Sequence, residues 1–451
     1  MDLTFKQLVE ATGGVLCGTG AGEVSVKSIS TDSRSIQEGA LFVPIVGERF
    51  DGHDYIQQAV SLGACCVLTE KTLGESLFPY ILVKCTRQAL LDIASFYLDL
   101  HDVNVVAISG SAGKTTTKDM IASVLSRKFR TKKTPGNYNN EIGLPLSIFG
   151  LEKSDEVVVL EMGMNHSGEI RKLTQVAKPD VAVVTNIGFA HIGNFKDQTG
   201  VLHAELEIAE GLRRDGRLFL NGDDPLLSGG VAKELTESLS VCRLGAKNIK
   251  SVKSLGLDGS NCHFRINGQD VFVNIPLPGR QLVTNALLAC AVGLYMGVAP
   301  EEITRGFADY EPTAGRLNAI KSNERTIIND AYNASPDSVK NALEVLSKEE
   351  GRKVAVLGDM LELGAFAEEC HIDVGKYAAG LGIDIVVTVG NLAKHICEGF
   401  DAVKGKHQSS LPFPEKKDFL IASEKILQSG DIILVKASRG AKFEEITEKL
   451  V

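Results

Sequence analysis

A short apolar strand that runs into a glycine-rich loop and then a helix constrains this chain most. Val105 to Ile108 predict the strand, and Thr115 to Lys128 predict the helix. Between them lies the loop Gly110-Ser111-Ala112-Gly113-Lys114-Thr115-Thr116, although Ile108 stands where the full phosphate-loop pattern has its first glycine. In such a loop the backbone N–H groups approach phosphate, the lysine reaches the β and γ phosphates, and the threonine ligates Mg²⁺. The loop therefore predicts a nucleotide site.

Further apolar runs predict two units in which strands and helices alternate. Continuous β-branched runs suit strands that are buried on both faces of a parallel sheet. Helical patterns such as Val201 to Leu212 separate them, and Asn267-Gly268 predicts a tight hairpin between His263–Ile266 and Val271–Ile275. The predicted strands are Val103–Ile108, Val157–Leu160, Asp180–Thr185, Thr326–Asn329, Lys353–Leu357, Asp384–Val389 and Asp431–Val435.

The length of the chain indicates three domains. At about 150 residues per domain, 451 residues exceed one ordinary core. We predict an α/β protein with a mixed α/β domain over 1–100, a central P-loop-type domain with a mostly parallel sheet over 101–311, and a Rossmann-like doubly wound domain over 312–451.

Composition narrows the possible partners and the compartment. The net charge of -9 and a pI near 5.6 oppose general nucleic-acid binding, which selects basic faces. No signal peptide is recognisable, and no stretch reaches the roughly 18 apolar residues of a membrane span. The nine cysteines lack metal-like spacing, so we expect free thiols in a reducing cytoplasm.

Polar residues at predicted strand ends indicate where the site lies. Lys114, Glu161 and His191 each follow a strand of the middle unit, at the edge where open α/β sheets bind ligands. A carboxylate and an imidazole there could hold Mg²⁺ against ATP phosphates, although each alone is more often a cap or a loop histidine. Asp330, Gly358-Asp359 and Lys436 share an edge of the last unit, which suggests a cleft between two domains.

Three other polar segments leave two interpretations open. Lys132, Lys133 and Asn137 to Asn140 form either a solvated face or a phosphate-facing loop. Residues 30–34 and 47–53 have anion-binding potential but equally fit ordinary turn chemistry.

Together these motifs resemble the Mur ligase family over nearly the whole chain, most closely its members that add D-alanyl-D-alanine. The specific segments are Glu161 to Asn165 with Gly168 to Ile170, Asn186 to Gly188 with His191, Asp330 to Pro336, Leu357 to Gly364, and Lys436 to Arg439. The resemblance implies a cytoplasmic ligase that uses ATP and Mg²⁺ to phosphorylate the carboxylate ending a UDP-N-acetylmuramoyl-tripeptide. The amine of D-alanyl-D-alanine then attacks. A monomer with no nucleic-acid or membrane partner is expected.

The resemblance also implies individual roles. Lys114, Glu161 and His191 are expected to be catalytic, with Mg²⁺ on Thr115, Glu161 and His191. The loop Gly110 to Thr116 and the side chains Asn285, Arg316 and Asp330 are expected to bind the nucleotide. The loop Asp32, Ser33 and Arg34 is expected near the UDP end of the substrate, which makes 1–100 a UDP-substrate domain.

Three positions depart from the family pattern. Gln281-Leu282 replaces His-Asn, and Ala437 replaces a glycine. Most important, Glu205 stands in an Ala-Glu-Leu-Glu helix where the family has a CO₂-carbamylated lysine. A glutamate keeps the negative charge on a shorter arm, so we expect a catalytic Glu205 that holds a second Mg²⁺ directly or through water. The alternative is a solvated helix residue.

Two rival functions remain at this level. Another Mur ligase, which adds the third peptide residue, commonly carries Asp-Asn-Pro-Arg, whereas this chain has Tyr332 to Pro336 there. A non-catalytic nucleotide-binding regulator is supported only by Glu205 and Gln281-Leu282, and it is opposed by the intact Lys114, Glu161 and His191.

Overall fold

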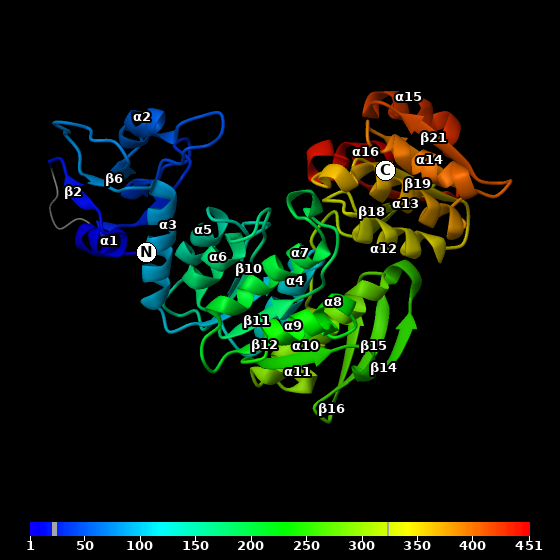
Figure 1. The fold of residues 1–451 in the computed structure, drawn as a ribbon, viewed down its shortest axis with the longest axis horizontal. Helices are drawn as coiled ribbons and strands as arrows, with labels where there is room; N and C mark the ends of the chain where they lie inside the picture. The colour runs from blue at the N-terminus through cyan, green and yellow to red at the C-terminus, as the bar shows by residue number, and fades with distance from the viewer. Residues whose placement is uncertain (20–24, 323) are drawn as a thin grey trace.

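Three α/β units follow one another along the chain in the computed structural model, which describes residues 1–19, 25–322 and 324–451. The N-terminal and C-terminal units lie at opposite ends of the central unit (Figure 1). The predicted three-domain architecture is therefore confirmed. The proposed boundaries fall after α3 and between α11 and β17, and we retain 1–100, 101–311 and 312–451 as proposed domain limits.

The N-terminal unit is built on a five-stranded sheet of order β2-β7-β6-β5-β4. Only β2 pairs antiparallel in it, and β1 pairs separately with β3. Thr4 begins α1 with a capping box, because its hydroxyl accepts from the Gln7 N–H while the Gln7 side chain accepts from the Thr4 N–H. The strands are β1 Leu3–Thr4, β2 Val15–Cys17, β3 Ser25–Val26, β4 Ser28–Ser30, β5 Ala40–Phe42, β6 Ala64–Thr69 and β7 Tyr80–Leu82, and the helices are α1 Phe5–Thr12, α2 Ile56–Ser61 and α3 Thr86–Asp99.

The central unit has a parallel six-stranded sheet of order β13-β12-β11-β8-β10-β9. Its first strand, β8, lies between β11 and β10, so the loop after β8 opens at the point where the strand order reverses. The strands are β8 Asn104–Ser109, β9 Thr131–Lys133, β10 Val157–Glu161, β11 Val181–Val184, β12 Arg217–Asn221 and β13 Ser240–Leu244.

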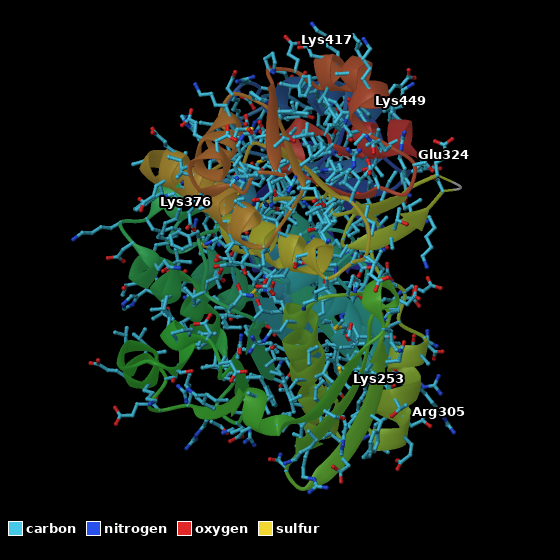
Figure 2. The ribbon with its side chains drawn as sticks, turned by 90° about the vertical axis from the view of Figure 1, so that its right-hand side faces the viewer. Lys253, Arg305, Glu324, Lys376, Lys417 and Lys449 are labelled. Carbon is cyan, nitrogen blue, oxygen red and sulfur yellow. The ribbon has the colours of Figure 1, made fainter. Side chains whose placement is uncertain are left out.

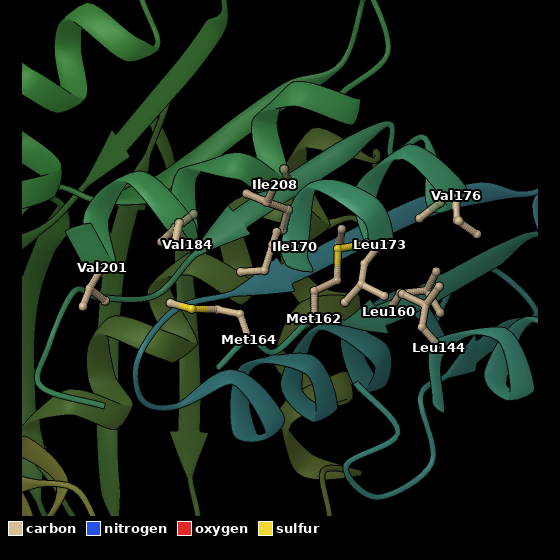
Figure 3. Close-up of a cluster of buried hydrophobic side chains, with 14 of the residues drawn as sticks. Leu144, Leu160, Met162, Met164, Ile170, Leu173, Val176, Val184, Val201 and Ile208 are labelled. Carbon is tan, nitrogen blue, oxygen red and sulfur yellow. The ribbon is translucent and has the colours of Figure 1, made fainter. Parts of the chain in front are cut away.

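Helices cover both faces of this sheet. Val105 and Ala107 of β8 pack into the core under α5 and α6, whereas Val106 and Ile108 pack into the core under α4 and α10. Figure 3 shows the first of these cores, with Leu160 and Met162 against Ile170 and Leu173. The helices are α4 Lys114–Leu125, α5 Gly143–Phe149, α6 Glu169–Ala177, α7 Gln198–Leu206, α8 Pro225–Ser228, α9 Gly230–Leu235, α10 Arg280–Tyr295 and α11 Pro300–Ala308.

The predicted hairpin is present and belongs to a three-stranded sheet of order β14-β15-β16. Ile266 pairs with Gln269, and Asn267 and Gly268 both have positive φ (49° and 82°), as a two-residue turn requires. The strands are β14 Ile249–Ser254, β15 Ser260–Ile266 and β16 Gln269–Ile275.

The C-terminal unit has a six-stranded sheet of order β17-β18-β22-β19-β20-β21, parallel except for β17. Helices α12, α13 and α14 cover one face, while α15 and α16 cover the other, which makes the unit doubly wound. The strands are β17 Asn318–Lys321, β18 Thr326–Asn329, β19 Lys353–Gly358, β20 Ile385–Val389, β21 Ser409–Phe413 and β22 Ile432–Lys436, and the helices are α12 Pro336–Ser347, α13 Ala367–Gly380, α14 Lys394–Val403, α15 Lys416–Ile426 and α16 Glu444–Leu450.

Charged side chains cover the outside of the molecule. Lys253, Arg305 and Lys376 project outward in Figure 2. Across the described residues, no helix is both long and apolar enough to cross a membrane. All nine cysteines carry free thiols, as expected.

Candidate active site

The glycine-rich loop joins β8 to α4 and needs its glycines. Gly110 has φ 128°, and a Cβ there would lie 2.2 Å from the Thr185 Oγ1. Gly113 caps α4 with φ 81°, and a Cβ there would lie 2.7 Å from the Asn285 Nδ2. Only glycine meets both the left-handed backbone and the close approach. The N-terminus of α4 is thereby left open toward a ligand.

The loop is held in shape by residues that follow β11. The Ala112 N–H donates to Asn186 Oδ1 at 3.0 Å, and the Ala112 carbonyl accepts from Thr185 Oγ1 at 2.6 Å and Asn186 Nδ2 at 2.9 Å. Lys114 Nζ folds back over the loop and donates to the Gly110 carbonyl at 2.6 Å. The cradle is thus preorganised, and the lysine ammonium lies above it.

Glu205 lies behind the loop, on α7. Its side chain is buried, and Oε2 accepts from the Gly110 N–H at 2.8 Å and from the Ser109 hydroxyl. Burial raises the pKa of the Glu205 carboxyl, while the nearby Lys114 charge and these hydrogen bonds act the other way. The interpretation of Glu205 as a solvated helix residue is therefore wrong. Its catalytic role stays a prediction.

Glu161 ends β10 and presents a carboxylate oxygen without a partner. Oε1 accepts from Asn139 Nδ2 at 2.8 Å. Oε2 is buried, accepts no hydrogen bond from any described residue, and lies 3.7 Å from Lys118 Nζ. A buried carboxylate oxygen without a hydrogen bond is satisfied by a donor or by a cation. Glu161 is accordingly suited to hold a cation.

His191 lies in the loop after β11 and meets the C-terminal unit. Its Nδ1 is 2.6 Å from Glu362 Oε2. The nearby His191 imidazole lowers the pKa of the Glu362 carboxyl, chiefly by hydrogen bonding. Both residues have positive φ, and the neighbouring Gly193 N–H donates to the Glu362 carbonyl at 3.1 Å. The contact places the imidazole at the boundary between the two units.

A second contact between the units comes from Arg316, in the segment between α11 and β17. Its Nη2 donates to the Thr115 hydroxyl at 3.0 Å, and its guanidinium lies 4.2 Å from the centre of the Tyr332 ring. Asp330 accepts from Lys436 Nζ, whose pKa is lowered by burial. Asp330 directly follows β18, and Lys436 is the last residue of β22. Arg316 thus brings a second positive charge to the glycine-rich loop.

One cavity of about 390 Å³ lies between the central and C-terminal units, within the usual size range of ligand pockets. The expected residues that line it are Ser111, Ala112, Gly113, Lys114, Thr115, Thr116, Glu161, His191, Asn285, Arg316, Asp330 and Lys436. Gly110 and Glu205 do not line it, and Glu205 supports the loop from behind by accepting from the Gly110 N–H. Among the described residues, no group of three or more His, Cys, Asp or Glu side chains is arranged to hold a metal by itself.

Other expected residues lie elsewhere. Asp359 is not among the residues that line the cavity, and its carboxylate accepts from the Leu392 and Ala393 N–H groups in the turn before α14. Asn137, Asn139 and Asn140 line the cavity, whereas Lys132 and Lys133 pair with Glu152 and Asp119 outside it. The two parts of that segment thus have different roles.

The loop expected near the UDP end lies in the N-terminal unit. Arg34 donates to both carboxylate oxygens of Asp32 at 2.9 Å, which lowers the pKa of Asp32 to about 2. Ser33 is buried and donates to Gln58 Oε1 at 3.2 Å. These contacts organise the loop and leave the Arg34 guanidinium largely exposed.

Two features of the site were not expected from the sequence. Lys118 is buried beside Glu161, one helical turn after Lys114 on the same face of α4, and that spacing was the available signal. Gln281 accepts from Asn341 Nδ2, which links α10 to α12 across the cavity. Gln281 therefore has a partner of its own despite its departure from the family pattern.

Comparison with known proteins identifies the family. Residues 25–96 match the Mur ligase family catalytic domain, residues 108–293 the Mur ligase middle domain, and residues 315–439 the Mur ligase glutamate ligase domain. These matches cover all three units. The chain belongs to the Mur ligase family.

Relatives within the Mur ligases resemble the chain over its full length. The UDP-N-acetylmuramoyl-tripeptide–D-alanyl-D-alanine ligase of Bacillus subtilis (strain 168) is 39% identical over 99% of this chain and 98% of that protein. A crystal structure of MurF from Acinetobacter baumannii is 31% identical, with a TM-score of 0.92 over 100% of this chain and 99% of its own. MurF ligase from Thermotoga maritima in complex with ADP is 29% identical, with a TM-score of 0.83 over 94% of this chain and 97% of its own.

Proposed function

We propose that this chain is an ATP-dependent ligase that adds D-alanyl-D-alanine to UDP-N-acetylmuramoyl-tripeptide in bacterial peptidoglycan synthesis. The observation that carries the proposal is one cavity that gathers Lys114, Glu161 and Arg316 from two units. The names of the full-length relatives supply the substrates, and the ADP in the Thermotoga maritima complex supports ATP as the cosubstrate.

The nucleotide phosphates are proposed to bind on the glycine-rich loop. The open N-terminus of α4 offers backbone N–H groups and a positive dipole end to the phosphates, and Lys114 offers an ammonium. Asn285 lines the same cavity, and its buried Nδ2 donates to no described residue. Arg316 and Asp330 approach from the C-terminal unit. These residues are placed to hold ATP on both sides of the boundary.

The residues present fit a magnesium ion. Glu161 Oε2 is a buried oxygen without a hydrogen-bond donor among the described residues, and the Thr115 hydroxyl and His191 lie in the same cavity. Because these groups are too few to form a complete protein cage, phosphate oxygens would complete the coordination, as is usual for Mg²⁺. When bound, the ion neutralises charge on the transferring phosphoryl group.

The proposed reaction has two steps. The terminal carboxylate of the tripeptide attacks the γ-phosphorus of ATP, which forms an acyl-phosphate and releases ADP. The free amine of D-alanyl-D-alanine then attacks the acyl carbon, and inorganic phosphate leaves the tetrahedral intermediate. Lys114 and Arg316 stabilise the negative charge that develops on the phosphoryl oxygens. Glu205 fixes the loop from behind.

The donor nucleotide is proposed to bind at the N-terminal unit. Asp32 and Ser33 are held by side-chain hydrogen bonds, and the exposed Arg34 guanidinium suits a diphosphate. The donor would then reach from this unit to the cavity. On this proposal the enzyme acts in the cytoplasm as a monomer.

Product analysis tests the choice of substrates. The enzyme is incubated with ATP, Mg²⁺, a UDP-muramoyl-tripeptide or dipeptide donor, and a panel of amines. The products are identified by their masses in mass spectrometry. We expect one product, from the tripeptide donor and D-alanyl-D-alanine. Efficient use of a free diamino acid on a dipeptide donor would instead identify the ligase that adds the third residue.

A further inference from the structure

Lys118 is a buried lysine that has no part in the proposed reaction. Its side chain is 2% exposed, and the residue lies on α4, one turn beyond Lys114. Nζ donates to the Gly136 carbonyl at 3.0 Å. It lies 3.7 Å from Glu161 Oε2 and 3.6 Å from Asp119 Oδ1. A fully buried ammonium is costly unless it compensates a buried negative charge.

Asp119 is already engaged by other partners. Its Oδ1 accepts from Lys133 Nζ at 2.8 Å, and its Oδ2 accepts from the Thr313 hydroxyl at 2.8 Å. Lys118 is farther from Asp119 than Lys133 is, so Lys133 and Thr313 supply the close contacts of that carboxylate. The buried charge that remains for Lys118 to compensate is that of Glu161.

Lys118 is close enough to Glu161 for electrostatic attraction but too far for a hydrogen bond. At 3.7 Å the ammonium makes no hydrogen bond, so a lone pair of Oε2 stays free for a ligand. The positive charge nevertheless offsets the carboxylate electrostatically, because the attraction is strong in a site shielded from water. A free divalent cation at Glu161 would meet both an attracting carboxylate and a repelling ammonium.

We propose that Lys118 makes cation binding at Glu161 depend on the nucleotide. This inference rests on the proposed function, in which Glu161 holds the ion. With Lys118 in place, the pair Lys118 and Glu161 carries no net charge and does not retain a free divalent ion. The phosphates of ATP add negative charge next to Glu161 and so raise the affinity for the ion. The ion therefore binds only together with the nucleotide. Lys118 is a positioning residue for the ion and does not touch the reacting atoms.

The test measures metal binding rather than turnover. Mn²⁺, which takes similar oxygen ligands, is titrated into full-length enzyme and followed by electron paramagnetic resonance, without nucleotide and with ADP, at about pH 8 where carboxylates are ionised. The parent is expected to bind Mn²⁺ tightly only with ADP. Lys118→Met is expected to bind Mn²⁺ without ADP about tenfold more tightly than the parent, or better, because a like charge close to the ion has been removed.

A matched control separates this effect from loss of a lysine in general. Lys133→Met removes an equal charge from the far side of Asp119 and leaves the Glu161 contact intact, so it should bind Mn²⁺ as the parent does. An equal gain in both variants, or no gain in Lys118→Met, would overturn the inference. Lys118→Gln provides a second variant should Lys118→Met not fold. It also removes the positive charge but keeps an amide group on the side that faces the Gly136 carbonyl. Mn²⁺ binding without ADP should again become about tenfold tighter than in the parent, and unchanged affinity would contradict the proposal.

Glu161→Gln distinguishes failure of this inference from failure of the proposed metal site. If Glu161 holds the ion, this variant loses the ADP-dependent Mn²⁺ signal whatever Lys118 does. If the signal persists, the metal assignment itself is wrong. If Glu161→Gln loses the signal while Lys118→Met behaves like the parent, the metal assignment is supported and only the proposed role of Lys118 is wrong.

Discussion

Replacement of Glu205 is expected to impair catalysis more than nucleotide binding. In the structure its Oε2 accepts from the Gly110 N–H at 2.8 Å and from Ser109. Hydrogen bonds to a charged group contribute about 1.5–3 kcal/mol, and an orphaned buried donor costs about 1–3 kcal/mol. Glu205→Ala removes the acceptor, so Gly110 is no longer fixed beneath the phosphates. At about 1.4 kcal/mol per factor of ten, we expect kcat to fall about 10- to 100-fold.

The assay compares single-turnover ligation with ADP affinity in folded protein, as judged by circular dichroism. The dissociation constant of ADP should change by less than about threefold, because the other contacts of the loop remain. Glu205→Gln keeps an acceptor without the charge and should fall between the parent and Glu205→Ala. An alanine variant as active as the parent would refute the role of Glu205.

Bicarbonate provides the second arm of this test. A glutamate carboxylate needs no CO₂ to form, unlike a carbamylated lysine. The parent rate should therefore be the same in degassed and bicarbonate-containing buffer. Glu205→Lys, which restores the residue type of the family pattern, should be slow in degassed buffer and recover with bicarbonate. A parent rate that rises several-fold with bicarbonate would contradict the account.

Three further results are expected. Lys114→Ala should abolish ligation, by about 10²- to 10³-fold or more in kcat, while the circular dichroism spectrum stays unchanged, and near-normal turnover in steady-state kinetics would end the phosphate-loop assignment. Gly110→Ala should weaken ADP binding in calorimetry, because its Cβ would lie 2.2 Å from the Thr185 Oγ1, and parental affinity would contradict this. Hydrogen bonds from Arg34 lower the pKa of Asp32 from its ordinary value of 3.8 to about 2. The ionised Asp32 therefore stabilises the folded state at a pH above 3.8, and this stabilisation is lost as the pH falls toward 2. Carbon NMR of Arg34→Met should show that pKa returning toward 3.8, and an unshifted pKa would count against the pairing.

The buried strands were predictable because parallel sheets covered on both faces leave an uninterrupted apolar run. Thr326–Asn329 matches β18 at both ends, and Asn267-Gly268 located the turn between β15 and β16. The partner strand β14 was missed because Ile249–Ser254 lies at an exposed edge, where no apolar alternation is required.

Helix ends depend on tertiary contacts that the sequence pattern does not reveal. The helix predicted over Val201 to Leu212 ends at Leu206 and tightens into the 3-10 helix Glu207–Gly211. At that point Glu207 is buried and its carboxylate accepts from the Gly168 N–H at the start of α6, a long-range contact that the helical pattern does not indicate.

The site could be predicted where sheet topology alone brings residues together. Lys114, Glu161 and His191 lie at or just beyond the carboxyl ends of neighbouring strands, so one cavity was expected to contain them. The contact of Glu362 with His191 and the burial of Lys118 depend on how units and helices pack, and the sequence gives only spacing. The sequence alone indicates only that Glu205 is a polar residue in a helix. Its neighbours Val201, Leu202, Ala204 and Leu206 are all buried, and these apolar neighbours were the available signal that Glu205 is buried too.

Phosphate release is the most direct test of dipeptide-dependent ligation by this enzyme. Inorganic phosphate is measured with ATP, Mg²⁺ and UDP-N-acetylmuramoyl-tripeptide, with and without D-alanyl-D-alanine. We expect steady phosphate release only when the dipeptide is present, with one phosphate for each product molecule found by mass spectrometry. Phosphate release that does not depend on the dipeptide, or nucleotide binding without any release, would contradict the assignment of this chain as a D-alanyl-D-alanine-adding ligase.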